Sequence, residues 1–84
     1  MNVRQLPPID PGWSVFGSDA RLVGRVDAVF ADYLLVRTSG LVPVDLYVPL
    51  SAVAGVGGDR IALGEPSDGA YQRWHRPLRR APHA

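Results

Sequence analysis

Short apolar runs alternate with Gly, Asp and Ser from residue 13 to residue 63 of this chain, and no long helical pattern interrupts them. Period-two alternation and β-branched residues are typical of strands, and Gly, Asp and Ser between them are typical of turns. The pattern predicts strands at 13–16, 22–31, 33–38, 44–49 and 60–63. A single helical or 3₁₀ turn is expected near Ser51, and a glycine-rich turn is expected over 55–59.

The alternation also predicts which side chains form the core. Trp13 and Phe16 are expected there, and each longer strand should place every second residue on the inner face. The expected inner residues are Val26, Ala28 and Phe30, then Leu34, Val36 and Thr38, then Val44, Leu46 and Val48. Gly24 inside its strand predicts a bulge or a sharp bend.

Five or six short strands at this spacing, with glycine at the corners, predict an all-β fold: a small closed β-barrel over residues 13–64. Closure would hide the strand edges. Residues 1–12 contain three prolines and should form an extended lead-in. Residues 65–84 should form a linker and a basic aromatic tail, because Pro66, Ser67, Asp68 and Gly69 lie near the start of this segment.

The chain has 84 residues and no cysteine, which predicts one small domain without disulfides or Cys-based zinc. Such a domain often gains stability by self-association, so a homo-oligomer is expected. No apolar run is long enough to span a bilayer and no signal peptide is evident, which favours a cytoplasmic protein. Residues 1–70 hold five arginines against eight acidic residues, whereas residues 71–84 hold four arginines and no acid.

Catalytic and metal-binding patterns are not evident. The aspartates at 19, 27, 32, 45 and 59 lie mostly beside Gly or Ser or at strand ends, where Asp is ordinary turn chemistry, and their spacing matches no calcium loop. No Gly-x-Ser-x-Gly motif occurs, and both histidines lie in the tail, at 75 and 83. The glycines at 55, 57 and 58 precede a strand and lack the Lys-Ser/Thr of a phosphate loop. We expect no enzyme, no metal and no cofactor.

The segment around residues 41–47 is the first candidate contact surface. Leu41 and Val42 stand next to Pro43 in a loop, with Tyr47 nearby, and such a loop is apolar for an exposed position. The alternative is a buried plug of the barrel. Arg37 and Tyr33, on one face of their strand, are expected to border the same patch.

The tail is the second candidate, because it interleaves aromatic side chains with guanidinium groups. Trp and Arg are enriched at the centres of protein interfaces, and the same mixture also suits phosphate contacts and base stacking. A third alternative is a tail folded back on the barrel, with Trp74 packed and the arginines in water. The residues concerned are Tyr71, Arg73, Trp74, Arg76, Arg79 and Arg80.

Several motifs resemble the PRC-barrel family: Gly-Ser-Asp at 17–19, Val-Gly-Arg-Val at 23–26, Tyr-Leu-Leu-Val at 33–36, Leu-Tyr-Val-Pro-Leu-Ser-Ala-Val at 46–53 and Gly-Asp-Arg-Ile at 58–61. Together with Trp-His-Arg-Pro at 74–77, they are similar to the bacterial DUF2171 group, short uncharacterised proteins related to PRC barrels. The resemblance implies a docking or assembly module and supplies no catalytic residues. Its Trp-x-x-Pro ending implies that Trp74 packs on its own or a neighbouring barrel.

These observations predict a non-enzymatic β-barrel adaptor or assembly module that contacts a protein partner or itself. The alternative is binding of nucleic acid, RNA above all, through the tail. A small-ligand pocket inside the barrel is disfavoured, since side chains fill barrels with so few strands.

Overall fold

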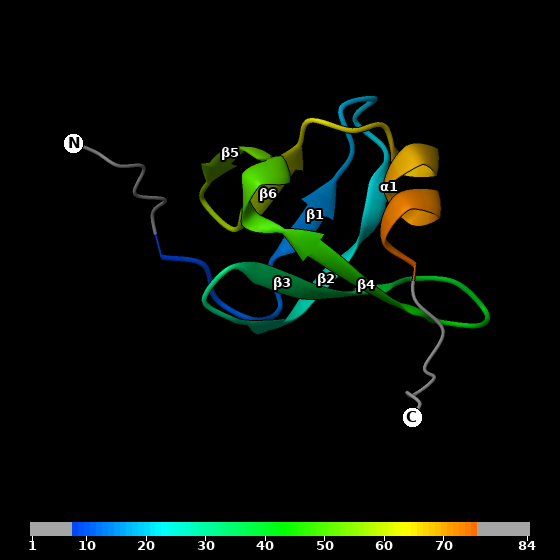
Figure 1. Ribbon diagram of the computed structural model, residues 1–84, viewed down its shortest axis with the longest axis horizontal. Coiled ribbons are helices and arrows are strands. Elements are labelled where there is room, and N and C mark those ends of the chain that lie inside the picture. Colours follow the sequence, from blue (N-terminus) through cyan, green and yellow to red (C-terminus); the bar gives the residue numbers. More distant parts are fainter. Residues whose placement is uncertain (1–7, 76–84) are drawn as a thin grey trace.

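The computed structural model describes residues 8–75 and shows one curled, six-stranded sheet with a single short helix (Figure 1). The all-β fold class predicted from the sequence is therefore confirmed. The elements are β1 (Ser14–Phe16), β2 (Leu22–Val29), β3 (Tyr33–Thr38), β4 (Asp45–Pro49), the 3₁₀ turn η1 (Leu50–Ala52), β5 (Val53–Gly57), β6 (Arg60–Leu63) and α1 (Ser67–Trp74).

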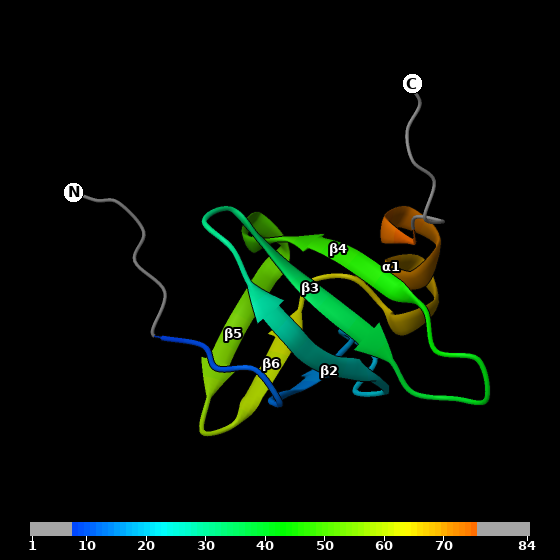
Figure 2. The same cartoon turned by 90° about the horizontal axis from the view of Figure 1, so that it is seen from below.

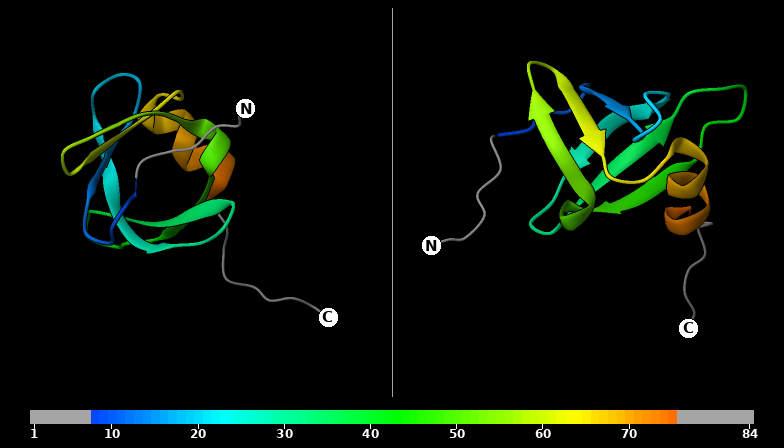
Figure 3. Two further views of the ribbon diagram at one scale, coloured as in Figure 1. Left: turned by 90° about the vertical axis from the view of Figure 1, so that its left-hand side faces the viewer. Right: turned by 90° about the horizontal axis from the view of Figure 1, so that it is seen from above.

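The strand order is β4-β3-β2-β1-β6-β5. All neighbouring pairs are antiparallel except β1 and β6, which run parallel and join the two halves of the sheet. Two views along different axes show how the sheet curls around its interior (Figure 3). The hydrogen-bonded order nevertheless has two ends, β4 and β5, so the predicted closed barrel is a half-barrel whose ends are connected through η1.

The inner face of the sheet forms an apolar core, and the described chain buries no polar or charged residue there. The predicted inner residues Leu34, Val36, Leu46 and Val48 are all fully buried. Side chains of this size contribute roughly 1.5–3 kcal/mol each when fully buried. Val15, Val23, Val26, Ile61, Leu63 and Ala70 complete the core.

The second half of β2 differs from the prediction because a bulge lies between Val26 and Ala28. Val26 still pairs with Val36 on the inner face, but the extra residue reverses the alternation, so Ala28 pairs with Leu35 on the outer face. Phe30 is consequently 44% exposed and not a core residue. Phe16 also lies outside the core, because Val15 is the residue of β1 that points inward, whereas Trp13 packs against the core as expected.

Gly24 lies where the backbones of β2 and β3 approach closely. A Cβ atom at this position would stand 2.2 Å from the carbonyl oxygen of Arg37. A register shift in the β1–β2 pairing lies beside it, between Val15 and Phe16. This register shift agrees with the bulge that Gly24 predicts as one of its two alternatives, the other being a sharp bend.

Strand β5 occupies a segment that was predicted to be a turn. Gly55 and Gly57 belong to the strand, and only Gly58 and Asp59 form the turn to β6, with Gly58 at a φ of +59°. The prediction failed because glycine has a low strand propensity and two of the five residues of β5 are glycine.

Helix α1 occupies the end of the segment that was predicted to be a linker and the start of the predicted tail. Ala70 is fully buried in the core and Trp74 packs against it, so the helix covers the inner face at the end where β2 and β4 lie against it (Figure 2). Beyond the helix, His75 forms a β-bridge with Leu46 and covers part of the free edge of β4. At the other edge, β5 pairs with β6 and with no other strand of residues 8–75.

Candidate functional site

Three aromatic rings form a row on the outer face of β2–β4, which we call the aromatic face: Phe30, Tyr33 and Tyr47. Phe30 stacks on Tyr33 with ring centroids 4.7 Å apart, and Tyr33 contacts Tyr47 at 5.6 Å. Leu35, opposite Tyr47 in the register, lies beside them. Phe30 and Tyr47 are 44% and 38% exposed. Aromatic side chains gathered on an exposed sheet face are typical of contact surfaces.

An ion pair separates the aromatic face from the loop between β3 and β4. The Arg37 Nε lies 3.3 Å from the Asp45 Oδ1, and these two residues form the next pair after Leu35 and Tyr47 on the same face of the sheet. Beyond it, Leu41 is 99% exposed and Val42 is 79% exposed. We call these two residues the loop tip. The alternative of a buried plug is therefore wrong, and the structure does not join the loop tip to Tyr47 directly.

The described part of the tail is folded against the sheet. Trp74 is half-buried against the core, while Tyr71 is 43% exposed and stacks on His75 with ring centroids 5.0 Å apart. The Arg73 Nη1 lies 3.7 Å from the Glu65 Oε2, and its guanidinium is 6.0 Å from the Trp74 ring. Of the other predicted tail contacts, Arg76, Arg79 and Arg80 lie outside the described residues.

A shallow groove on the outer face of β1, β6 and β5 was not predicted from the sequence. Across the strands, Ala62 pairs with both Phe16 and Gly55, and Arg60 pairs with Gly57. Val15 and Ile61 point into the core, so these five side-chain positions point outward. The Arg60 guanidinium stands 5.4 Å from the centre of the Phe16 ring.

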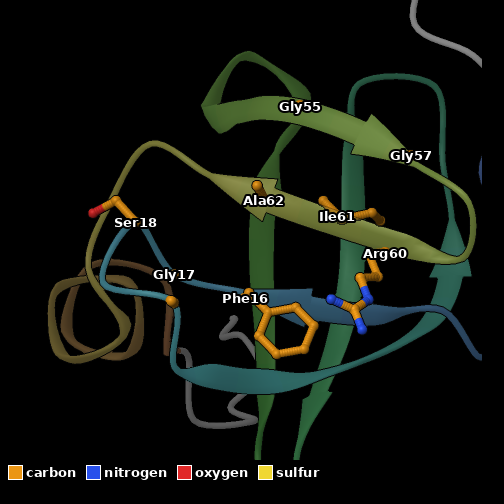
Figure 4. Close-up of a pocket in the computed structure, with 9 residues that line it drawn as sticks. Phe16, Gly17, Ser18, Gly55, Gly57, Arg60, Ile61 and Ala62 are labelled. Atoms are coloured by element: carbon orange, nitrogen blue, oxygen red, sulfur yellow. The ribbon is translucent and has the colours of Figure 1, made fainter.

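The surface therefore descends from Phe16 and Arg60 over Ala62 to two glycines (Figure 4). We call this feature the glycine groove, and its volume is about 460 Å³. The sequence signal that could have revealed it is the period-two spacing of Gly55 and Gly57 ahead of Arg60-Ile61-Ala62.

Among the aspartates, Asp19 has a defined structural role. Its carboxylate accepts hydrogen bonds from the backbone N–H groups of Arg21 and Ser67 and from the Ser67 hydroxyl. Desolvation acts to raise the pKa of Asp19, but the hydrogen bonds from Ser67 and Arg21 outweigh it and hold the pKa below its ordinary value. Asp19 therefore stabilises its own turn, as expected, and it also binds the start of α1.

The described residues hold neither a metal-binding cluster nor a membrane-crossing helix. Within residues 8–75, no group of three or more His, Asp or Glu side chains is arranged to hold a metal ion. Over the same residues, no helix has the length and apolar character needed to cross a membrane.

Comparison with known families identifies the group to which this fold belongs. Residues 9–70 match the model of the family described as an uncharacterised protein conserved in bacteria, DUF2171. The match spans both sheet halves and the first part of α1, and the chain belongs to this family. No curated protein and no solved structure matches this chain.

Proposed function

We propose that this protein is a small, non-enzymatic module of the bacterial cytoplasm that binds proteins, itself included, through the aromatic face. The single observation that carries the proposal is the stacked row of Phe30, Tyr33 and Tyr47 on the outer surface of the sheet. Covering water-exposed rings with a partner lowers the free energy of the complex, and Tyr is enriched at interface centres. A kinship with PRC barrels, as the sequence motifs imply, fits the same docking role.

The register gives the surface a defined layout. From the β2–β3 turn outward, the aromatic rings come first, then Leu35 beside Tyr47, then the Arg37–Asp45 pair, and last the loop tip. An apolar centre bordered by a polar pair is the usual arrangement of a protein interface. Because Leu41 and Val42 lie beyond the charged pair, we assign them to the border of the contact and Tyr47 to its centre.

Nucleic-acid binding through the tail is the alternative proposal. It has less support among the described residues, because Trp74 packs against the core and Arg73 lies beside Glu65. It predicts an affinity for RNA that falls steeply with salt, with a slope set by the number of phosphates neutralised.

The test compares Tyr47→Ser with Tyr71→Ser, since both tyrosines are exposed to a similar extent but lie on different elements. Self-association is measured by sedimentation over a range of concentrations, and partner capture by immobilised protein at low and high salt. We expect Tyr47→Ser to weaken association by about tenfold or more, as at an interface centre, and Tyr71→Ser to leave it unchanged. Equal behaviour of Tyr47→Ser and the unaltered protein would refute the proposal.

A further inference from the structure

The two glycines of β5 are not required by any contact or backbone conformation within residues 8–75. Neither Gly55 nor Gly57 has a positive φ, and a Cβ atom at either position would meet nothing within 4 Å. Glycine in a strand interior weakens the strand, so a β-branched residue would be more stable at both positions. A glycine in a strand that is not required by the strand's own conformation or contacts often marks the close approach of a ligand or of another backbone.

The groove above these glycines also offers one defined polar group. Arg60 is exposed, and its guanidinium is held over the Phe16 ring at 5.4 Å. A guanidinium that lies over a ring keeps N–H groups available to a carboxylate, which it can bind in bidentate fashion. The groove is therefore complementary to a flat apolar group with a carboxylate beside it.

The same chain presents such a pair of groups at the turn between β2 and β3. Phe30 is 44% exposed and is supported from behind by the stacked ring of Tyr33. Asp32, also exposed, lies two positions further along. The backbone of this turn is fixed from within, since the Phe30 N–H donates to the Tyr33 carbonyl and the Leu50 N–H donates to the Asp32 carbonyl. The turn is thus a rigid projection with a ring and a negative charge.

From this complementarity we infer that the glycine groove binds the β2–β3 turn of a second copy of this chain. Phe30 of the second copy lies on Gly55 and Gly57, and its Asp32 pairs with Arg60. The turn and β5 lie at the end of the molecule away from α1 in both perpendicular views (Figure 1 and Figure 2). Two copies related by a two-fold axis can therefore each place a turn in the other's groove, which closes the assembly as a dimer.

This inference rests on the proposed function in so far as Phe30 belongs to the aromatic face, and the experiment separates the two. Gly57→Val places a side chain in the groove, and its Cβ atom meets no described atom of its own chain within 4 Å. At a concentration where both proteins are monomeric, we expect this variant to melt no lower than the unaltered protein. We also expect it to dimerise about tenfold or more weakly, as when a central contact is lost. A Gly57→Val protein that dimerises normally would overturn the inference, while the effect of Tyr47→Ser would still decide the proposed function.

A charge exchange identifies the occupant. Arg60→Asp and Asp32→Arg should each weaken the dimer, and the two changes combined in one chain should restore most of the association, because the pair is re-formed with opposite sign. Arg73→Glu is the matched control, since it reverses an exposed arginine on α1 and should leave the dimer intact. Failure of the double variant to recover, or a monomeric mass of the unaltered protein at every concentration, would exclude the second copy as the occupant.

Trans-complementation provides the final check. An Asp32→Arg chain has an intact groove but an altered turn, whereas a Gly57→Val chain has an intact turn but a filled groove. Each alone should be monomeric at a concentration where the unaltered protein is dimeric. Mixed in equal amounts, they should form a weak heterodimer through the one contact that remains. A mixture that stays monomeric at the highest concentration used would count against the reciprocal arrangement.

Discussion

Asp19 and Ser67 lie 48 positions apart in the sequence and are joined by two hydrogen bonds. The Ser67 N–H donates to the Asp19 Oδ1 at 3.2 Å, and its hydroxyl donates to the Asp19 Oδ2 at 3.0 Å. Pro66, the residue before the helix, has no side chain that can cap it, so the β1–β2 loop supplies the acceptor instead. One carboxylate thereby fixes the start of α1 to the sheet.

We expect Asp19→Asn to lower the melting temperature and Ser67→Ala to lower it less, because Ser67→Ala retains the backbone donor. The pKa of Asp19 is lowered by folding from its ordinary value of 3.8, so its contribution to stability is complete above that value. The contribution is lost as the pH falls through the lower pKa of the folded state. Thermal unfolding followed by circular dichroism between pH 2 and pH 7 measures it.

Asp27→Asn is the matched control, because Asp27 is an exposed strand residue of β2. Its melting curve should follow that of the unaltered protein across the acid range. If Asp19→Asn showed the same acid dependence as the unaltered protein, the carboxylate would not be the group that holds α1.

Two glycines in neighbouring parts of the sheet should respond to alanine in opposite ways. Gly24→Ala would place a Cβ atom 2.2 Å from the Arg37 carbonyl oxygen, and relief requires separation of the β2 and β3 backbones. We expect a loss of about 2–3 kcal/mol of unfolding free energy. Gly57→Ala meets no atom within 4 Å and should be neutral or stabilising by about 0.5–1 kcal/mol. Urea unfolding of both variants tests the contrast, and similar losses at the two positions would contradict it.

The sequence predicted the fold best in strands whose two faces carry different kinds of side chain. In β3 and β4 the alternation placed Leu34, Val36, Leu46 and Val48 correctly in the core. It failed for Phe30, because a single bulged residue reverses every later position of a strand and leaves no mark in the composition. That failure concealed the aromatic face, since Phe30 was counted as core.

The two missed elements have a common cause. β5 has glycine at two of its five positions, and α1 has Gly69 in its first turn, so neither segment has the intrinsic propensity of the structure it adopts. Both are stabilised by tertiary contacts: β5 by pairing with β6, and α1 by Ala70 and Trp74 against the core. The start of the helix did carry a signal, because Pro66 and the acidic Asp68 are typical of helix N-termini.

Trp74 should contribute to stability more than to binding. Its ring is half-buried against the core, and Trp74→Ala should cost about 2–3 kcal/mol, somewhat less than for a fully buried tryptophan. Tyr71→Ala, on the exposed side of the same helix, should cost about 1 kcal/mol or less. Chemical denaturation measures both. A Trp74→Ala protein of normal stability that failed to bind its partner would instead assign Trp74 to the interface.

The loop tip, in contrast, should contribute to binding more than to stability. Leu41 and Val42 are 99% and 79% exposed, so replacing both by Ser removes no core contact and should change the unfolding free energy by about 0.5 kcal/mol or less. If the loop tip borders the contact made by the aromatic face, the double variant should weaken partner capture by less than Tyr47→Ser does, because border residues contribute little compared with the centre. Sedimentation and capture assays on the same samples measure both effects. A double variant that lost more binding than Tyr47→Ser would move the centre of the interface to the loop and require the Arg37–Asp45 pair to lie within it.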